Sequence, residues 1–214
     1  RTKKKEYSAM LSAKIFSQPF KVILTLCLSL IMSSTALAAD LEITSLIGYT
    51  FSPKLNNSDN TASLPSTDEP NIALGLSWKD SNAGQGQVLI NYISRDFTDN
   101  TDQSIHSFDT VYAHFNGVGF FKERNYITTV GMGIGMTYFK SDYDSVFYPS
   151  ISVSVGTRYE FSKNLALITE LRAYATLTKD DDTLFCQNES TCVAHFDSSI
   201  WIDSQISIGI AYRF

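Results

Sequence analysis

Hydrophobic and polar residues alternate with a period of two along nearly all of the chain after residue 40. In the segment 126–138, large apolar residues stand at most alternate positions, with threonine and glycine between them. Successive side chains of a strand point to opposite faces, so this period predicts strands that have one apolar and one polar face. Eight strands are expected, at residues 41–51, 72–78, 88–93, 110–115, 126–138, 150–161, 165–177 and 200–214.

The connections between these strands differ in a regular way. The first, third, fifth and seventh are the more polar, and the first (53–70) and last (179–197) are long. The second, fourth and sixth are shorter, as in the tight turn 162–164. Membrane barrels have strands of about 9–11 residues, short periplasmic turns and longer outer loops. The spacing therefore predicts an up-and-down antiparallel barrel.

Alternation alone does not separate a membrane barrel from a soluble one such as a lipocalin, whose apolar face turns inward. Here the less apolar face carries a row of glycines, Gly131, Gly133 and Gly135, and several charged residues within strands. The charged residues are Arg95, Arg158, Glu160, Glu170, Arg172 and Asp203. Charges and glycines make a poor hydrophobic core but suit a polar lumen, in which the glycines leave room for long Arg and Tyr side chains. We therefore predict an all-β, eight-stranded transmembrane barrel with its apolar face toward lipid.

The same six charged residues are expected to form an ion-pair network in the lumen. The turn 162–164 sets a register that places Arg158 diagonal to Glu170. A paired-carboxylate active site is the alternative interpretation. The structural interpretation is favoured because buried charges are expected to be paired.

Residues 1–38 read as a secretory signal peptide, and residues 39–214 as the barrel domain. Basic residues precede an apolar run from Val22 to Met32, and Ala36-Leu37-Ala38 forms a small-x-small cleavage site. The apolar run is shorter than the roughly 20 residues that a membrane-spanning helix needs. A retained anchor and a lipoprotein site at Cys27 are the alternatives; Leu26 stands where the latter wants a small residue.

Charge narrows the classes of partner. Charged residues make up 18% of the chain, below the roughly 25% of soluble domains. The chain has 17 basic and 22 acidic residues, and without residues 1–38 it keeps 11 and 21, a net charge of −10. An acidic exported domain lacks the basic face that phosphate contacts need, so no nucleic-acid partner is expected.

Cys186 and Cys192 are the cysteines of the expected mature chain, and both fall in its last loop. In an oxidising compartment this pair favours a disulfide. Two free thiols, or a metal site with His195, are the alternatives. The run 180–182 of three aspartates is either a divalent-cation site or, as we favour, a solvated acidic loop.

No catalytic, cofactor or metal site is expected. His106, His114 and His195 are dispersed along the sequence. A hydrolase of the lipid A deacylase type needs a His and a Ser together on the lipid-facing side. His106 and Ser107 are adjacent, so on a strand they point to opposite faces.

The C-terminal strand carries a family resemblance. Its alternating residues Ile206, Ile208, Ile210, Tyr212 and Phe214 resemble the terminal signal of outer-membrane barrels. The alternative is that Phe214 is only a surface aromatic residue. The resemblance implies that the barrel-assembly machinery reads this end.

A narrower resemblance covers residues 85–214. It rests on the segments 112–117, 130–138, 165–167 and 184–186 together with the second cysteine. These resemble a group of uncharacterised small outer-membrane proteins in the OmpA/OmpX/OmpW-like barrel class. Asn116 stands where that group often has a second glycine. The group implies the eight-stranded fold but no activity.

These observations favour a structural or surface-interaction protein of a Gram-negative outer membrane, with its lumen filled by polar side chains. A narrow channel or carrier for small or apolar solutes is the second hypothesis, and a lipid-modifying enzyme the third. The expected partners are outer-membrane lipid, lipopolysaccharide, the barrel-assembly machinery and periplasmic chaperones. We expect a monomer without cofactors.

Overall fold

The computed structural model describes the barrel from residue 41 to the C-terminus, with gaps in its loops. The residues described are 41–53, 55–57, 63–64, 68–98, 105–179, 184–188, 191–192, 194–196 and 198–214. The expected signal peptide lies outside them. No helix within these ranges is long and apolar enough to cross a membrane, which has no bearing on a β-barrel.

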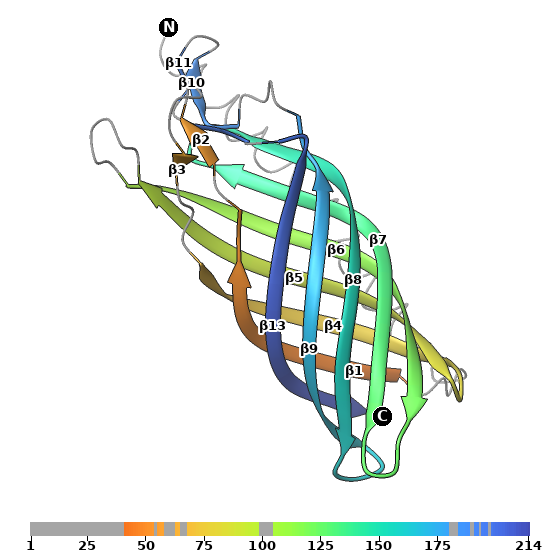
Figure 1. Cartoon of the computed structure of the whole chain (residues 1–214). Helices are drawn as coiled ribbons and strands as arrows, with labels where there is room; N and C mark the ends of the chain where they lie inside the picture. The colour runs from red at the N-terminus through yellow and green to blue at the C-terminus, as the bar shows by residue number, and fades with distance from the viewer. Residues whose placement is uncertain are drawn as a thin grey trace, which may run out of the picture. The chain divides into compact units, whose positions relative to one another are not determined.

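Eight long strands form one closed antiparallel barrel (Figure 1). They are β1 (Leu41–Phe51), β4 (Glu69–Ser81), β5 (Gly84–Thr98), β6 (Ile105–Lys122), β7 (Ile127–Ser141), β8 (Ser145–Glu160), β9 (Leu165–Leu177) and β13 (Ile200–Arg213). Each pairs with its sequence neighbours in the barrel, and β1 pairs with β13 to close the sheet. The predicted fold class and all eight strands are confirmed.

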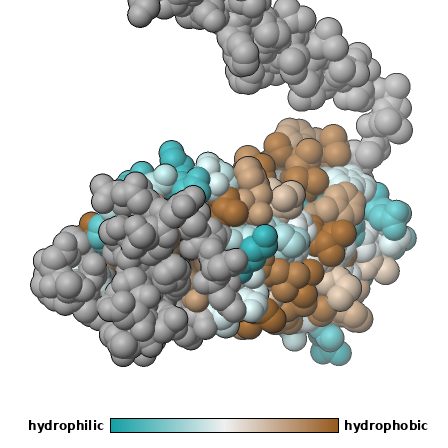
Figure 2. Space-filling view, turned by 90° about the horizontal axis from the view of Figure 1, so that it is seen from above, coloured by the Kyte–Doolittle hydropathy of each residue, from teal (hydrophilic) through white to brown (hydrophobic). Residues whose placement is uncertain are grey.

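The side chains alternate between lumen and outer surface as the period of two predicts. In β7, Met132 and Ile134 are 69% and 70% exposed, whereas Thr137 and Phe139 are fully buried. Hydrophobic side chains cover much of the barrel's outer face seen in Figure 2. Lipid contains no hydrogen-bonding partner for a sheet edge, so an apolar outer face is compatible with lipid only if the sheet closes.

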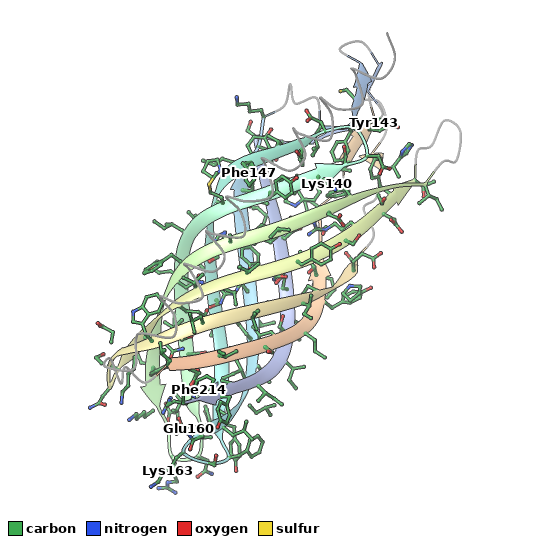
Figure 3. The ribbon with its side chains drawn as sticks, turned by 180° about the vertical axis from the view of Figure 1, so that it is seen from behind. Lys140, Tyr143, Phe147, Glu160, Lys163 and Phe214 are labelled. Atoms are coloured by element: carbon green, nitrogen blue, oxygen red, sulfur yellow. The ribbon has the colours of Figure 1, made fainter. Side chains whose placement is uncertain are left out.

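The two ends of the barrel differ. Lys140, Tyr143 and Phe147 lie at one end, here called the loop end, and Lys163 and Phe214 lie at the other, the turn end (Figure 3). At the turn end, two to four residues join β4 to β5, β6 to β7 and β8 to β9. Outward-facing rings pair near both ends, including Tyr138 with Phe147 and Tyr212 with Phe214. Aromatic belts of this kind sit at headgroup level in membrane barrels.

The loop end contains short strands that the alternation did not predict. They are β2 (Leu55–Asn57), β3 (Ser63–Leu64), β10 (Cys186–Asn188), β11 (Thr191–Cys192) and β12 (Ala194–Phe196). β12 pairs with β2, which joins the first long loop to the last. Pairing between distant loops depends on how the barrel brings them together, so a local pattern of two or three residues carries no signal for it.

The glycine row of β7 makes room for side chains of neighbouring strands. A Cβ added to Gly135 would lie 2.1 Å from the Ala113 carbonyl oxygen and 2.7 Å from the His114 ring. At Gly133 it would lie 2.0 Å from the Asn116 Oδ1. The expectation that glycines leave room in the lumen holds, but the side chains that use it are His114 and Asn116 rather than long Arg and Tyr residues.

We expect Gly135→Ala to lower the free energy of unfolding by about 1–3 kcal/mol, because the new methyl group meets backbone that cannot move aside. The measurement is urea unfolding of the protein in lipid vesicles. Gly117→Ala is the matched control, since a Cβ there meets nothing within 4 Å. Equal stability of the two variants would contradict this account of the glycine row.

Candidate functional site: the barrel lumen

The loop end of the lumen is closed by a cluster of apolar and aromatic side chains. The buried members are Leu55, Phe97, Phe108, Phe139, Tyr148, Leu184, Phe185, Phe196 and Trp201. Leu55, Leu184, Phe185 and Phe196 come from the loop segments and the others from the barrel strands. Phe185 contacts both Phe97 and Phe108 edge-on, with ring centroids 5.4 Å apart. The long loops therefore place side chains inside the barrel mouth.

A buried ion pair lies next to this aromatic cluster. Arg95 of β5 pairs with Asp203 of β13, and neither side chain is exposed. The guanidinium of Arg95 stands 5.6 Å from the Phe108 ring centroid, and its Nε donates to the Ser52 Oγ at 2.8 Å. Tyr112 donates from its hydroxyl to the same Asp203 carboxylate. This pair ties opposite sides of the barrel together, because β5 and β13 are not neighbours in the sheet.

Two tyrosine rings continue the packing toward the middle of the lumen. Tyr112 and Tyr174 stack with their centroids 3.9 Å apart and their planes 9° from parallel. The Asn91 Nδ2 donates to the Tyr174 hydroxyl at 3.3 Å and to the Gln205 Oε1 at 2.5 Å. The buried rings and amides occupy the space that a wider barrel would leave for a channel.

The next group of lumen side chains is a set of hydrogen-bonded polar residues centred on His114. Its Nε2 lies 2.8 Å from the Ser150 Oγ, and its Nδ1 lies 3.1 Å from the Ser152 Oγ. Ser152 donates to the Asn116 Oδ1 at 2.9 Å. The same oxygen also accepts a hydrogen bond from Arg172 at 3.2 Å.

Arg172 forms an ion pair with a residue of its own strand, β9. Both Nε and Nη2 of Arg172 donate to the Glu170 carboxylate, at 2.7 and 2.9 Å. The two residues are separated by one position, so their side chains share the lumen face of β9. The charge of Arg172 in the lumen is therefore balanced by Glu170.

A third ion pair lies at the turn end. The two terminal nitrogens of Arg158 donate to the two Glu42 oxygens at 2.7 Å each. Arg158 is also 3.3 Å from Glu160, whose side chain is 46% exposed. Arg213 lies 3.4 Å from Glu42 and 4.0 Å from Glu160. This group joins β1 to β8 and β13 at the barrel mouth.

All six charged residues predicted for the lumen take part in ion pairs, but in three separate groups rather than one network. Arg158 pairs with Glu42 instead of the expected diagonal partner Glu170, and Glu160 lies at the mouth rather than inside. Glu42 and Arg213 were missed. Glu42 stands between Leu41 and Ile43 on the polar face of the first strand, so the alternation itself was the signal that could have found it.

The expectation of a polar lumen is wrong at the loop end. Aromatic side chains fill it there, and their inward positions alternate with polar residues such as Ser107, Asp96 and Lys140 on the outside. The hairpin of β5 and β6 carries polar residues outward near its tip, where a membrane-spanning segment would carry apolar ones. The alternation is reversed there because this part of the barrel extends beyond the apolar belt.

The histidines do not form the lipid-facing His and Ser arrangement that a lipid A deacylase needs. The hydrogen-bonded His114, Ser150 and Ser152 are each buried in the lumen, 5% exposed or less, and not on the lipid face. His106 stacks against Phe97 at 5.4 Å. Over the ranges that the structure describes, no group of three or more His, Cys, Asp or Glu side chains could hold a metal ion. The side chain of His195 and the run 180–182 lie outside those ranges.

Two sequence-predicted sites remain: the cysteine pair of the last loop and the expected assembly signal of the last strand. Cys186 and Cys192 oppose each other in the register of β10 and β11. The Cys192 side chain is outside the described residues, so the disulfide stays a prediction. The residues expected to form the assembly signal are exposed on the outside of β13 and at the residue that follows it: Ile206, Ile208, Ile210, Tyr212 and Phe214. Recognition by an assembly machinery also stays a prediction.

Several solved structures share this fold at low sequence identity. The crystal structure of Neisserial surface protein A is 12% identical, covers 81% of this chain and 97% of its own, and gives a TM-score of 0.57. The outer membrane protein OprG from Pseudomonas aeruginosa is 10% identical, with coverages of 83% and 96% and a TM-score of 0.54. No protein-family model and no curated protein matches the chain significantly. The likeness shows the fold alone, which is that of the small outer-membrane barrels.

We expect Asp203→Asn to destabilise the barrel by about 3–5 kcal/mol, because it leaves the Arg95 charge buried without a counter-charge. Urea unfolding in lipid vesicles measures the change. Glu160→Gln is the control: it also replaces a carboxylate by an amide, but at a half-exposed pair worth about 1 kcal/mol or less. If Asp203→Asn cost no more than Glu160→Gln, the buried pair would not have the role assigned to it.

The cysteine pair gives a separate prediction. Peptide mapping by mass spectrometry without reductant should recover Cys186 and Cys192 in one cross-linked fragment, since their strand positions are opposite. Alkylation of both thiols in the native protein before any reduction would refute the disulfide.

Proposed function

We propose that this chain is an integral outer-membrane β-barrel with a structural or surface-interaction role, and that its lumen is closed by its own side chains. The observation that carries the proposal is the succession of buried side-chain groups along the lumen. Aromatic rings fill the loop end, the Arg95–Asp203 pair and the stacked tyrosines lie beneath them, and Arg158 with Glu42 lies near the turn end. An eight-stranded barrel has little more interior space than its side chains need.

The surface role rests on the character of the loop end. Among the described residues of this end, two amines, those of Lys140 and Lys179, stand against six carboxylates: Asp68, Glu69, Asp96, Asp109, Asp142 and Asp144. The described segments 184–186 and 194–196 pack Phe185 and Phe196 into the barrel mouth, which anchors these segments to the barrel. A fixed acidic surface of this kind suits interaction outside the cell.

A narrow passage for small solutes is the second candidate. It is favoured by four buried amide atoms that have no hydrogen-bond partner among the described residues: Gln87 Oε1, Asn91 Oδ1, Asn116 Nδ2 and Gln205 Nε2. Buried amides are normally satisfied, and water in the middle of the lumen would satisfy them. Water there would provide a polar path that is interrupted by the aromatic cluster at the loop end.

We propose no enzymatic activity and no cofactor. Outer-membrane lipid and lipopolysaccharide are the proposed surroundings, with the barrel-assembly machinery and periplasmic chaperones as partners during assembly. The outward apolar stripe of β13 supports this proposal, because alternating exposed residues there are accessible to another protein before the barrel enters lipid.

Planar-bilayer recording tests the proposal. We expect the purified protein to give no open steps of nanosiemens size, because charged and aromatic side chains occlude the lumen. The paired variant Arg95→Ala/Asp203→Ala removes one occluding layer without leaving a charge unpaired, and should raise the ion conductance.

Nanosiemens steps from the unaltered protein would overturn the closed-lumen proposal and favour the passage. Thr157→Ala combined with Thr169→Ala is the control pair, because these hydroxyls bond to each other at 2.7 Å on the exposed outer face. Conductance that rose equally in the control would reflect loosening of the barrel rather than opening of the lumen.

A further inference from the structure

A groove lies on the outer face of the barrel near the turn end, over the neighbouring strands β4, β5 and β6. Residues of these three strands line it, including Trp78, Asp80, Gly86, Phe115 and Gly117. The volume of the groove is about 430 Å³, which is within the range of small-ligand sites. The buried groups on which the proposed function rests lie on the lumen face, so this groove is independent of them.

The indole of Trp78 forms one wall of the groove by crossing the backbone of β5. A Cβ at Gly86 would lie 2.4 Å from the Trp78 Cε2 and Cζ2 atoms, so a larger residue there would displace the ring. Across this glycine, the rings of Trp78 and Phe115 meet from β4 and β6 with centroids 5.5 Å apart. Phe115 is 56% exposed. Two aromatic rings from different strands therefore border the groove.

The floor beside these rings is bare backbone. Gly117 lies opposite Gly86 in the register of β5 and β6, and Gly119 lies opposite Gly84. A Cβ at Gly117 would meet no atom within 4 Å, and one at Gly119 would come no closer than 3.7 Å. On β7, Met132 is opposite Gly117 and is 69% exposed. The backbone is thus recessed between large outward side chains, and the recess suits a chain of methylene groups.

A carboxylate stands at the turn-end rim of the groove. Asp80 is exposed and makes no hydrogen bond or ion pair with any described residue. No lysine or arginine is among the described residues that line the groove. Tryptophan and tyrosine rings of membrane barrels lie at headgroup level, so a carboxylate beside Trp78 is placed where lipid headgroups are found. The groove therefore offers one negative charge and two aromatic rings to a headgroup.

We propose that this groove binds one phospholipid through an ammonium headgroup, with an acyl chain along the glycine floor. The proposal rests on the proposed placement of the barrel in a membrane. A primary ammonium donates charge-assisted hydrogen bonds to a carboxylate and is attracted to aromatic rings. Phosphatidylethanolamine is the lipid class that fits, because its headgroup carries a primary ammonium next to the phosphate.

Quenching of Trp78 fluorescence by brominated lipids tests the proposal. The chain has two tryptophans, and Trp201 is 2% exposed within the aromatic cluster of the lumen, so lipid bromines reach only Trp78. The protein is reconstituted in phosphatidylcholine vesicles that contain increasing fractions of brominated phosphatidylethanolamine or brominated phosphatidylglycerol. The second lipid has the same phosphate, with hydroxyl groups in place of the ammonium. We expect phosphatidylethanolamine to bind about fivefold more tightly, as one exposed ion pair and one cation–π contact imply.

Two variants with matched controls locate the preference in the groove. Asp80→Asn should remove most of it, whereas Glu123→Gln, at an exposed carboxylate of the turn end that does not line the groove, should keep it. Gly117→Leu should also remove the preference, because the new side chain fills the recess. Ala113→Leu is its control, since Ala113 is exposed on the outer face of the same strand but outside the groove.

Equal binding of the two lipids, or tighter binding of phosphatidylglycerol, would overturn the proposal, since the contact would then be unselective or guided by the cations of the turn end. An equal loss of preference in Asp80→Asn and Glu123→Gln would overturn it as well, because diffuse negative charge would explain the result. Failure of both brominated lipids to quench Trp78 would overturn the membrane placement of this face, and the proposal with it.

Discussion

Pairing between β1 and β13 is the interaction on which the rest of the structure depends. Ten residue pairs, from Glu42 opposite Arg213 to Phe51 opposite Ser204, join the first long strand to the last. Without this seam the sheet would have two edges whose amides and carbonyls lipid cannot satisfy. With it, the apolar side chains can face outward, and charged side chains on the other face, such as Arg95 and Asp203, are enclosed.

Enclosure makes pairing of the lumen charges obligatory. Asp203 lies opposite Arg95 across the barrel, and Glu42 lies opposite Arg158, so two ion pairs link strands that are far apart in the sheet. A buried pair adds little net stability by itself, but breaking one leaves a charge in a medium that cannot solvate it. Such pairs make the cost of slipped strand registers high, and thus favour a single arrangement of the barrel.

The two barrel ends present different chemistry as a result. At the loop end, side chains from the long loops complete an aromatic cluster below an acidic surface. At the turn end, the loops are too short to cover the mouth, and Arg213 competes with Arg158 for one carboxylate.

The alternation of residues determined the class of fold, the eight strands and, away from the loop end, the face that side chains occupy, because a period of two follows from strand geometry itself. It also placed Arg95, Arg172 and Asp203 inside the barrel. Which charges meet was decided only by the tertiary structure, since partners such as Glu42 and Arg158 are brought together by closure and strand stagger over 116 positions of sequence. The aromatic cluster and the short strands of the loop end arose in the same way. They depend on contacts between distant loops, which a local sequence pattern does not predict.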